Sequence, residues 1–357
     1  MTEELQVRRD DLAATRIASR EATAIADGEV RARVEAFALT ANNITYGVVG
    51  EKIGYWNFFP APAGWGVIPV WGFAQIVESR RPDVGEGERL YGYFPMASHV
   101  VMTPGKLRPE RLFDAAPHRS ALPPVYNAYA RVAREGGYDP STDEERMLLF
   151  PLYATSFCIF DYLLDRDWFG AEQAVIVSAS SKTAIGLAYA MADDPSAPRA
   201  IGLTSARNAD QVRALSLYDD VAVYDDLGAI DARTPTVVID MSGAEAVIDG
   251  LEARLGDAMR YCLQVGVTHH EATADFAGRM SERRSFFFAP AHIQKRAADW
   301  GPGAFDAKAL DFWRSAALRS RSWLKIERVA GARAIETAFH RLRAGEIAPD
   351  RGLICSF

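Results

Sequence analysis

The sequence of this 357-residue chain contains little cysteine. Its three cysteines, Cys158, Cys262 and Cys355, lie far apart and show no Cys-x-x-Cys spacing. Paired cysteines stabilise small secreted domains, and closely spaced cysteines hold structural zinc. The chain therefore predicts neither a disulfide framework nor a zinc knuckle, and we expect a cytoplasmic protein.

Long apolar runs and an excess of basic charge are also missing. The densest apolar run, residues 147–154, is far shorter than the roughly 20 residues that a membrane span needs. The N-terminal segment carries charges of both signs and lacks the apolar centre of a signal peptide. Lys and Arg number 40 against 47 Asp and Glu, which gives a net charge of −7. We therefore expect neither a membrane nor a nucleic acid as a partner.

Two catalytic signatures are absent as well. No Gly-x-Ser-x-Gly sequence occurs, which argues against a serine hydrolase. The six histidines include no pair spaced by four residues beside a carboxylate, so the sequence predicts no metal site.

The residues that are present indicate a globular α/β protein. Hydrophobic residues make up 49% of the chain and charged residues 24%, and the length suggests two domains. Short β-type segments fill the first part, at 29–37, 72–79, 89–94 and 99–103. Helix-length segments then alternate with short buried β-type runs, at 174–179, 200–204, 221–224, 236–240 and 261–265. This alternation predicts a parallel sheet with helices on its faces.

Two other segments are set apart by their composition. Residues 107–145, rich in Arg, Pro and Tyr, are interpreted as an inserted segment rather than a core element. Near the C-terminus, the pattern predicts a helix over 334–344 and a strand over 352–356.

The most informative segment is 174–191, a buried strand, a turn of small residues and a helix beginning near Thr183. Such a turn offers free backbone N–H groups and the positive end of the helix dipole to a pyrophosphate. We expect Ser180, Ser181, Lys182 and Thr183 to contact a dinucleotide there. The glycine fingerprint is degraded, because only Gly186 of its three glycines is kept. An ordinary strand-to-helix turn without a ligand is an equal alternative.

The next strand, 200–204, ends without the acidic residue that binds the ribose of NAD. Ser205 and Arg207 follow it, and they would hydrogen-bond and neutralise a 2′-phosphate. Lys182 adds a second cation near the same phosphates. The sequence thus favours NADP(H), with an ordinary solvated arginine as the alternative reading of Arg207.

The order of these segments resembles the medium-chain dehydrogenase/reductase superfamily, in its zinc-free, quinone-oxidoreductase-like branch. Residues 28–43 look like the opening strand and active-site loop of its GroES-like domain. The remaining similar segments are 72–79, 84–92, 97–101, 151–156, 221–224, 237–243 and 334–357. Within this superfamily, the strings at 40–47, 55–60, 178–184 and 295–301 resemble the family known as DUF2855.

The resemblance implies a GroES-like β domain plus a Rossmann domain with a doubly wound parallel sheet. The first would comprise residues 1–148, completed by 315–357, and the second residues 149–314. It also implies nucleotide contacts from Tyr224, Ser242, Val267 and Phe288. His269 and His270 follow the β-type run 261–267, and because that end of a parallel strand faces the cofactor crevice, we expect one of them to contact the nicotinamide ribose. A homodimer is expected, because the strand around 286–290 often pairs between subunits in this superfamily.

The departures from the superfamily pattern concern zinc. Gly72-Phe73-Ala74 stands where zinc members have Gly-His-Glu, and the active-site loop offers Asn42 and Asn43 instead of Cys. We therefore predict a zinc-independent, NADPH-dependent reduction of a conjugated carbonyl, enone or quinone-like small molecule by hydride transfer. Asn42, Asn43 and Tyr46 are the candidate catalytic hydrogen-bond donors. A plain Asn-Asn turn remains an alternative.

An aromatic stretch follows that loop. We expect Tyr55, Trp56 and Phe59, together with Tyr126, to line a pocket for a planar substrate. The same residues would equally well fill the core or a subunit contact. The rival function is a non-catalytic NADP(H)-binding or scaffold protein that retains the reductase fold.

Overall fold

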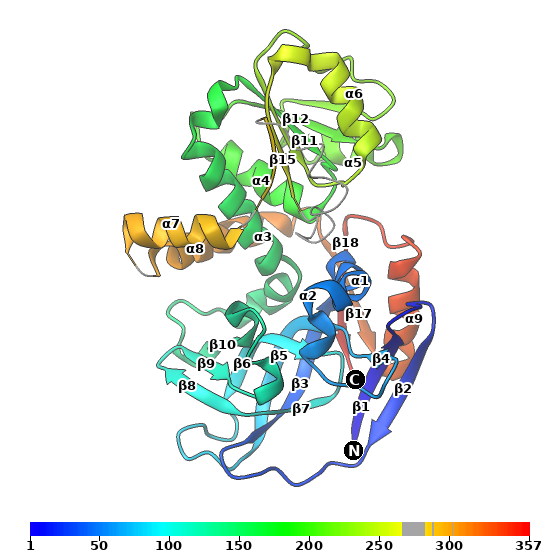
Figure 1. The fold of residues 1–357 in the computed structure, drawn as a ribbon, viewed down its shortest axis with the longest axis vertical. Coiled ribbons are helices and arrows are strands. Elements are labelled where there is room, and N and C mark those ends of the chain that lie inside the picture. Colours follow the sequence, from blue (N-terminus) through cyan, green and yellow to red (C-terminus); the bar gives the residue numbers. More distant parts are fainter. Residues whose placement is uncertain (266–282, 288, 302) are drawn as a thin grey trace. The chain divides into compact units, whose positions relative to one another are not determined.

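A computed structural model of the chain describes residues 1–265, 283–287, 289–301 and 303–357 (Figure 1). The chain forms two compact units. Unit 1 comprises Met1–Leu148 and Leu324–Phe357, and unit 2 comprises Leu149–Trp323. The first unit is therefore discontinuous in sequence and includes the last residues of the chain.

Unit 1 is built on two β-sheets. The smaller sheet has the order β2 (Thr15–Arg20), β1 (Thr2–Arg8), β4 (Trp65–Gly66). The larger runs β17 (Lys325–Ala330), β18 (Arg351–Ser356), β3 (Val30–Leu39), β5 (Pro69–Ser79), β6 (Arg89–Pro95), β10 (Ala128–Arg131), β9 (Arg111–Asp114), β8 (Pro104–Arg108), with β7 (His99–Met102) paired to β3. Only β17 and β18 pair in parallel, and the other described pairs are antiparallel. The last strand of the chain thus closes the sheet of the first domain beside β3.

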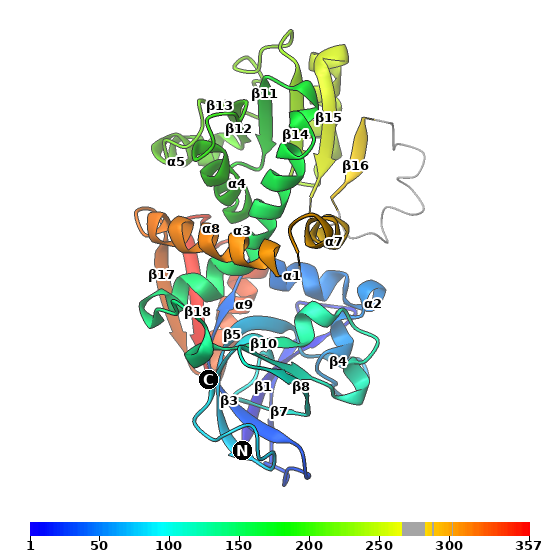
Figure 2. The ribbon, with the colours of Figure 1, turned by 90° about the vertical axis from the view of Figure 1, so that its left-hand side faces the viewer.

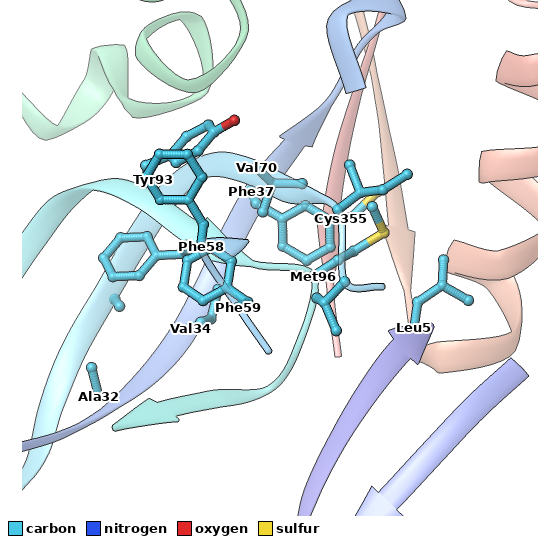
Figure 3. Close-up of a cluster of buried hydrophobic side chains, with 14 of the residues drawn as sticks. Leu5, Ala32, Val34, Phe37, Phe58, Phe59, Val70, Tyr93, Met96 and Cys355 are labelled. Carbon is cyan, nitrogen blue, oxygen red and sulfur yellow. The ribbon is translucent and has the colours of Figure 1, made fainter. Parts of the chain in front are cut away.

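The core of unit 1 lies where these sheets and α9 (Ala332–Arg343) meet. Figure 3 shows Phe58 and Tyr93 against one another, with Phe37, Met96 and Cys355 in the adjoining layer. The rings of Phe58 and Tyr93 meet edge to face, with centroids 5.3 Å apart. Aromatic pairs in this geometry contribute beyond the area that they bury.

Unit 2 contains a parallel sheet with the order β13 (Asp220–Val223), β12 (Arg199–Thr204), β11 (Gln173–Val177), β14 (Thr236–Asp240), β15 (Met259–Gln264), β16 (Arg284–Phe286) (Figure 2). Its helices are α3 (Asp143–Leu164), α4 (Lys182–Ala192), α5 (Ala206–Ala214), α6 (Glu245–Leu255), α7 (Ala289–Trp300) and α8 (Ala304–Ser320). Apolar residues alternate between the two faces of β11, with Ile176 in the cluster of α3 and α4 and Val175 in the cluster of α6. This is a doubly wound sheet, whose strand order reverses between β11 and β14.

The C-terminal return to unit 1 begins later than expected. We placed it at residue 315, but α8 continues to Ser320 and packs within unit 2. The Tyr153 and Ser320 hydroxyls lie 2.7 Å apart, and Phe150 meets Trp313 edge to face at 5.5 Å. These contacts hold the end of α8 to α3, so the boundary falls after Trp323.

The interpretation of 107–145 as an insertion outside the core is wrong. This segment supplies β8, β9 and β10 to the larger sheet. Tyr129 of β10 is buried, and its hydroxyl donates to the Tyr93 carbonyl at 2.6 Å. The high content of Arg hid this role, because Arg119 and Arg131 are themselves buried and paired with carboxylates.

Among the described residues, one helix meets the length and composition of a membrane span. In Pro140–Leu164, which includes α3, the most apolar 18-residue window has a mean hydropathy of 1.6, and half of that window is buried inside the fold. Asp161 of α3 is also buried and accepts a hydrogen bond from Arg296 Nε of α7 at 2.6 Å. Buried polar contacts of this kind are those of a core helix of unit 2.

Candidate functional site

The turn between β11 and α4 is ordered by its serines. Ser178 has a left-handed φ of 62°, and Ser181 caps α4 by accepting from the Ala184 N–H at 3.3 Å. Ser180 Oγ accepts from the Asn208 side chain at 3.1 Å, which ties the turn to α5. The helix begins at Lys182, one residue before the expected Thr183. The hydroxyls of Ser180 and Ser181 therefore shape the turn, whereas its backbone N–H groups form the positive end of α4.

Gly186 is the one glycine of the fingerprint that the chain keeps, and packing explains it. A Cβ at this position would lie 2.5 Å from Ser156 Oγ and 2.6 Å from Tyr153 Cδ1, both on α3. Ser156 Oγ also donates to the Thr183 carbonyl at 2.7 Å. The close approach of α4 to α3 thus requires glycine here, while serine and threonine suffice at the other two positions.

The end of β12 holds the residues expected to read the ribose. Ser205 precedes α5, yet its side chain caps no N–H, and its buried Oγ has no hydrogen-bond partner in the described part of the chain. Arg207, in the first turn of α5, is exposed, and no ion pair of it is seen among the described residues. A hydroxyl and a guanidinium for which the described residues offer no partner, at a strand end that has no acid, fit a 2′-phosphate.

The ends of β13 and β14 lie at the same edge of the sheet. Burial raises the pKa of Tyr224, which follows β13, and the nearby Ser178 side chain opposes that rise. Ser242 donates from both its N–H and its hydroxyl to Asp240 Oδ1, at 2.8 and 2.7 Å. The structure therefore brings Tyr224 to the β11 turn, whereas the Ser242 hydroxyl is engaged in closing its own loop. The predicted contacts Val267, Phe288, His269 and His270 lie outside the described residues.

Asn42, Asn43 and Tyr46 lie on a helix, α1 (Ala41–Val48), and the expectation of a loop is wrong. Asn43 Oδ1 accepts from the Thr40 N–H at 2.6 Å, and its Nδ2 donates to the Pro69 carbonyl at 2.8 Å. Asn43 is also 2% exposed. Both ends of the Asn43 amide are thus hydrogen-bonded, one at the start of α1 and one to β5. Asn43 is therefore a structural residue and not a catalytic candidate.

Replacing Asn43 by alanine is expected to lower the free energy of unfolding by about 1–3 kcal/mol, because a helix cap and a buried hydrogen bond are lost together. Urea denaturation measures this change. The matched control is Asn42→Ala on the same turn, which removes neither bond and should have a smaller effect. Equal stability of the Asn43→Ala protein and the wild type would contradict the structural role.

Tyr46 belongs to a group of aromatic side chains in unit 1. We call Tyr46, Tyr55, Trp71, Tyr93 and Tyr126 the tyrosine cluster. The ring centroids of Tyr46 and Tyr55 are 4.5 Å apart, and those of Tyr93 and Tyr126 are 4.6 Å apart. The hydroxyls of Tyr55 and Tyr126 lie 3.1 Å apart. The structure therefore brings the predicted residues Tyr46, Tyr55 and Tyr126 together, although they are separated by up to 80 positions in sequence.

Burial keeps the tyrosine hydroxyls of this cluster protonated. Burial raises the pKa of Tyr46, and it raises the pKa of Tyr55 to about 12. Side-chain hydrogen bonds of Tyr46 with Trp71, Asn42 and Tyr93 partly oppose the rise in its pKa. At neutral pH each hydroxyl keeps its proton and is available as a hydrogen-bond donor.

Trp56 and Phe59, which we expected in the same pocket, are buried in the core of unit 1. Trp56 is 1% exposed, and a Cβ on Gly50 or Gly66 would lie 2.4 or 2.2 Å from its ring. Phe59 is 8% exposed and packs in the core of unit 1, with the Arg119 guanidinium 5.2 Å from its ring centroid. Trp56 and Phe59 therefore fill the core, as the alternative to the pocket prediction described, and they are not candidates for contact with a substrate.

Sequence reasoning missed Tyr93 as a candidate, and it placed Trp71 only in a general aromatic stretch. Tyr93 lies on β6 and Trp71 on β5, in register with one another. The aromatic residues of these strands gave no sign that the Tyr93 ring contacts Trp71 and, on α1, Tyr46. A correct prediction of the pairing between β5 and β6 would have shown that Trp71 and Tyr93 are neighbours. Within the described ranges, no group of three or more His, Cys, Asp or Glu could hold a metal ion.

Solved structures share this fold. CurA in complex with NADPH, from Vibrio vulnificus, has a TM-score of 0.65 at 12% identity, over 99% of this chain and 98% of its own. The CurK enoyl reductase has a TM-score of 0.59 at 13% identity, over 99% of both chains. The quinone oxidoreductase from Coxiella burnetii has a TM-score of 0.54 at 14% identity, over 100% of this chain and 99% of its own. The likeness confirms the predicted fold, a GroES-like β domain with a Rossmann domain.

Sequence comparison adds a family. The family model described as "Protein of unknown function (DUF2855)" matches residues 37–348. No functionally curated protein matches the chain.

Proposed function

The chain belongs to the DUF2855 family, and we propose that it is an NADP(H)-dependent, zinc-independent oxidoreductase. Its substrate would be a small molecule with an activated carbonyl, such as an enone or a quinone-like compound. A homodimeric assembly and a cytoplasmic location belong to the same proposal, from the family resemblance and the low content of cysteine.

The assignment of NADP(H) as the cofactor rests mainly on the residues at the end of β12. Ser205 Oγ is buried without a partner in the described part of the chain, and the exposed Arg207 follows two residues later. An acidic residue here would accept the ribose hydroxyls of NAD and repel a 2′-phosphate, but residues 204–208 include none. The fold shared with CurA, which was solved with NADPH, supports the same assignment.

The turn after β11 would bind the pyrophosphate. The N–H groups at the start of α4 are directed out of the helix end, and the dipole of this eleven-residue helix favours an anion there. Bound NADPH would supply the hydride. Tyr224, held near Ser178, would lie along the nucleotide and exclude water from one side of it.

In unit 1, Asn42 and Tyr46 are the proposed donors to the substrate oxygen. Both lie on α1, and the raised pKa of Tyr46 keeps its hydroxyl protonated. Neutral donors fixed on a helix stabilise the negative charge that develops on a carbonyl oxygen when hydride is added to a conjugated system. Tyr46→Phe and Asn42→Ala would then reduce turnover more than they reduce NADPH binding.

The experiment that tests the cofactor assignment is calorimetric titration of the full chain with NADPH and with NADH. We expect NADPH to bind at least about tenfold more tightly, because a charge-assisted contact to the 2′-phosphate is absent from NADH. Equal affinities would refute the preference, and no binding of either would refute the function.

A second function is favoured by the commitment of Asn43 to α1. A non-catalytic NADP(H)-binding or scaffold protein would need no donor at that position. Binding of NADPH without its oxidation, across a panel of enones, quinones and aldehydes, would support this alternative over the reductase.

A further inference from the structure

A serine hydroxyl of α3 reaches the first turn of α4. Ser156 is fully buried, and its Oγ donates to the Thr183 carbonyl at 2.7 Å. A serine within a helix can satisfy its hydroxyl in its own helix, at the carbonyl four residues earlier. That carbonyl, of Leu152, lies 3.0 Å from Ser156 Oγ. Because the contact with Thr183 is the shorter of the two, the Ser156 hydroxyl joins the two helices.

Apolar packing surrounds this hydrogen bond. Ile159 of α3 and Leu187 of α4 belong to one hydrophobic cluster. Gly186 lets the helices approach, since a Cβ there would lie 2.5 Å from Ser156 Oγ. Apolar contacts have no preferred direction, whereas a hydrogen bond requires a defined distance and angle. The bond from Ser156 therefore fixes the position of the first turn of α4 along α3.

The turn that Ser156 holds is the one to which the proposed function assigns the pyrophosphate. Thr183 is the second residue of α4, and Ser181 caps the helix by accepting from the Ala184 N–H at 3.3 Å. The first N–H groups of a helix have no carbonyl within it, and they bind phosphate oxygens when correctly placed. Binding groups need to be held within about 0.5 Å of their productive positions. A shift of α4 along α3 would thus weaken phosphate binding without removing any group that contacts the phosphate.

From these contacts we infer that Ser156 is a positioning residue for the pyrophosphate of the cofactor, acting from α3 through the Thr183 carbonyl. The inference rests on the proposed function for the presence of a dinucleotide at this turn. Two determinants of affinity are then separate. The contact of α3 with α4 sets the affinity for the diphosphate, and Arg207 sets the affinity for the 2′-phosphate. Ser156, Thr183 and Arg207 all belong to unit 2.

The test titrates the full chain by calorimetry with NADPH, ADP and 2′-AMP. ADP carries a diphosphate and no 2′-phosphate, and 2′-AMP carries a 2′-phosphate and no diphosphate. We expect Ser156→Ala to weaken the binding of NADPH and ADP by about two- to tenfold, the contribution of one neutral hydrogen bond, and to leave that of 2′-AMP unchanged. Arg207→Glu should give the reverse pattern, with 2′-AMP binding weakened and ADP binding nearly unchanged.

The matched control is Thr155→Val, which removes the hydroxyl of the neighbouring residue of α3. The Thr155 hydroxyl donates to the Pro151 carbonyl of the same helix at 3.0 Å, so its loss should leave all three affinities unchanged. Ser156→Ala should lower the melting temperature no more than Thr155→Val does, because the Thr183 carbonyl keeps its bond within α4 and alanine favours a helix. A weaker affinity for ADP at unchanged stability is an effect that a purely structural serine would not have.

A second substitution perturbs the same contact from the other helix. In Gly186→Ala the new Cβ would lie 2.5 Å from Ser156 Oγ and 2.6 Å from Tyr153 Cδ1, so α4 must move away from α3. We expect the same pattern as for Ser156→Ala, with NADPH and ADP binding weakened and 2′-AMP binding retained. This change moves α4 without removing a polar group.

Two results for Ser156→Ala would overturn the inference. One is wild-type affinity for both NADPH and ADP, and the other is an equal loss of affinity for 2′-AMP, which would indicate a general effect on the fold. Both leave the proposed function standing, because the wild type still binds NADPH. Absence of NADPH and ADP binding to the wild type would instead refute the proposed function and, with it, the positioning role.

Discussion

Replacing Arg207 by glutamate is expected to weaken NADPH binding by about a hundredfold and to leave NADH binding nearly unchanged. Loss of a charge-assisted hydrogen bond removes about 1.5–3 kcal/mol, and each 1.4 kcal/mol is about tenfold in affinity. The new carboxylate also repels the 2′-phosphate and would accept the ribose hydroxyls of NADH. Calorimetric titration with both nucleotides measures the change.

A matched control for this substitution is available on the same helix. Arg213→Glu makes the same change of charge at the other end of α5, where Arg213 pairs with Asp210 at 3.0 Å. It should alter neither affinity, because the phosphate is expected at the N-terminal end. The probe 2′,5′-ADP, which carries the phosphate and lacks nicotinamide, should lose affinity for the Arg207→Glu protein as NADPH does. An equal loss for NADPH and NADH would contradict the role of Arg207 in reading the 2′-phosphate.

Replacing Arg119 by methionine is expected to lower the stability of unit 1 by about 3–5 kcal/mol, the usual effect of breaking one side of a buried ion pair. Arg119 and Asp114 are 1% and 5% exposed and lie 2.6 Å apart. Arg119 also donates to the Tyr129 hydroxyl at 2.8 Å and to the Tyr126 carbonyl at 3.1 Å. Its loss would leave the Asp114 carboxylate uncompensated and release the segment that carries Tyr126.

Urea denaturation followed by tryptophan fluorescence measures this effect, with Arg134→Met as the control at an exposed arginine. A second substitution, Asp114→Asn in the Arg119→Met protein, removes the uncompensated charge and should restore part of the stability. Stability equal to that of the wild type in Arg119→Met would show that the pair contributes nothing to the fold. Exchange of the Tyr126 amide hydrogen, which is bonded to the Pro123 carbonyl, should also become faster, because the segment is no longer held by Arg119 and opens more often.

The two results would bear on different parts of the molecule. The Arg207 substitution tests how unit 2 selects a nucleotide, and the Arg119 substitution tests what holds the tyrosine cluster of unit 1 in place. Arg119 holds the segment of Tyr126 by donating to the Tyr126 carbonyl, so its substitution acts on the position of that segment.

Local patterns in the chain were sufficient to predict the Rossmann part. An apolar strand, a turn of small residues and a helix follow one another within 174–191, and each can be recognised from the periodicity of its own residues. The same holds for α9 and β18, which begin within two residues of the predicted positions. The absence of an acid after β12 is likewise readable from the order of residues alone.

The sheet of β2, β1 and β4 was not predicted, because β1 and β2 are short and rich in charged residues, and the residues between them include no Gly or Pro that would mark a turn. The role of Asn43 depends on the Pro69 carbonyl, 26 positions away, and that of Trp56 on the close approach of Gly66. Sequence distance concealed both contacts. An Asn-Asn pair and an aromatic run are compatible with either a site or a core until their partners are known.

By itself the sequence determined the fold class and the family, because these depend on periodicity and on the order of segments and motifs. Only the tertiary structure decided which polar and aromatic side chains are already engaged. It assigned Asn43 to the start of α1, Trp56 to the core, and Trp71 and Tyr93 to a cross-strand pair of β5 and β6. The physical reason is that hydrogen-bond satisfaction and burial are properties of neighbours in space, and β5, β6 and α1 become neighbours only when the sheet forms.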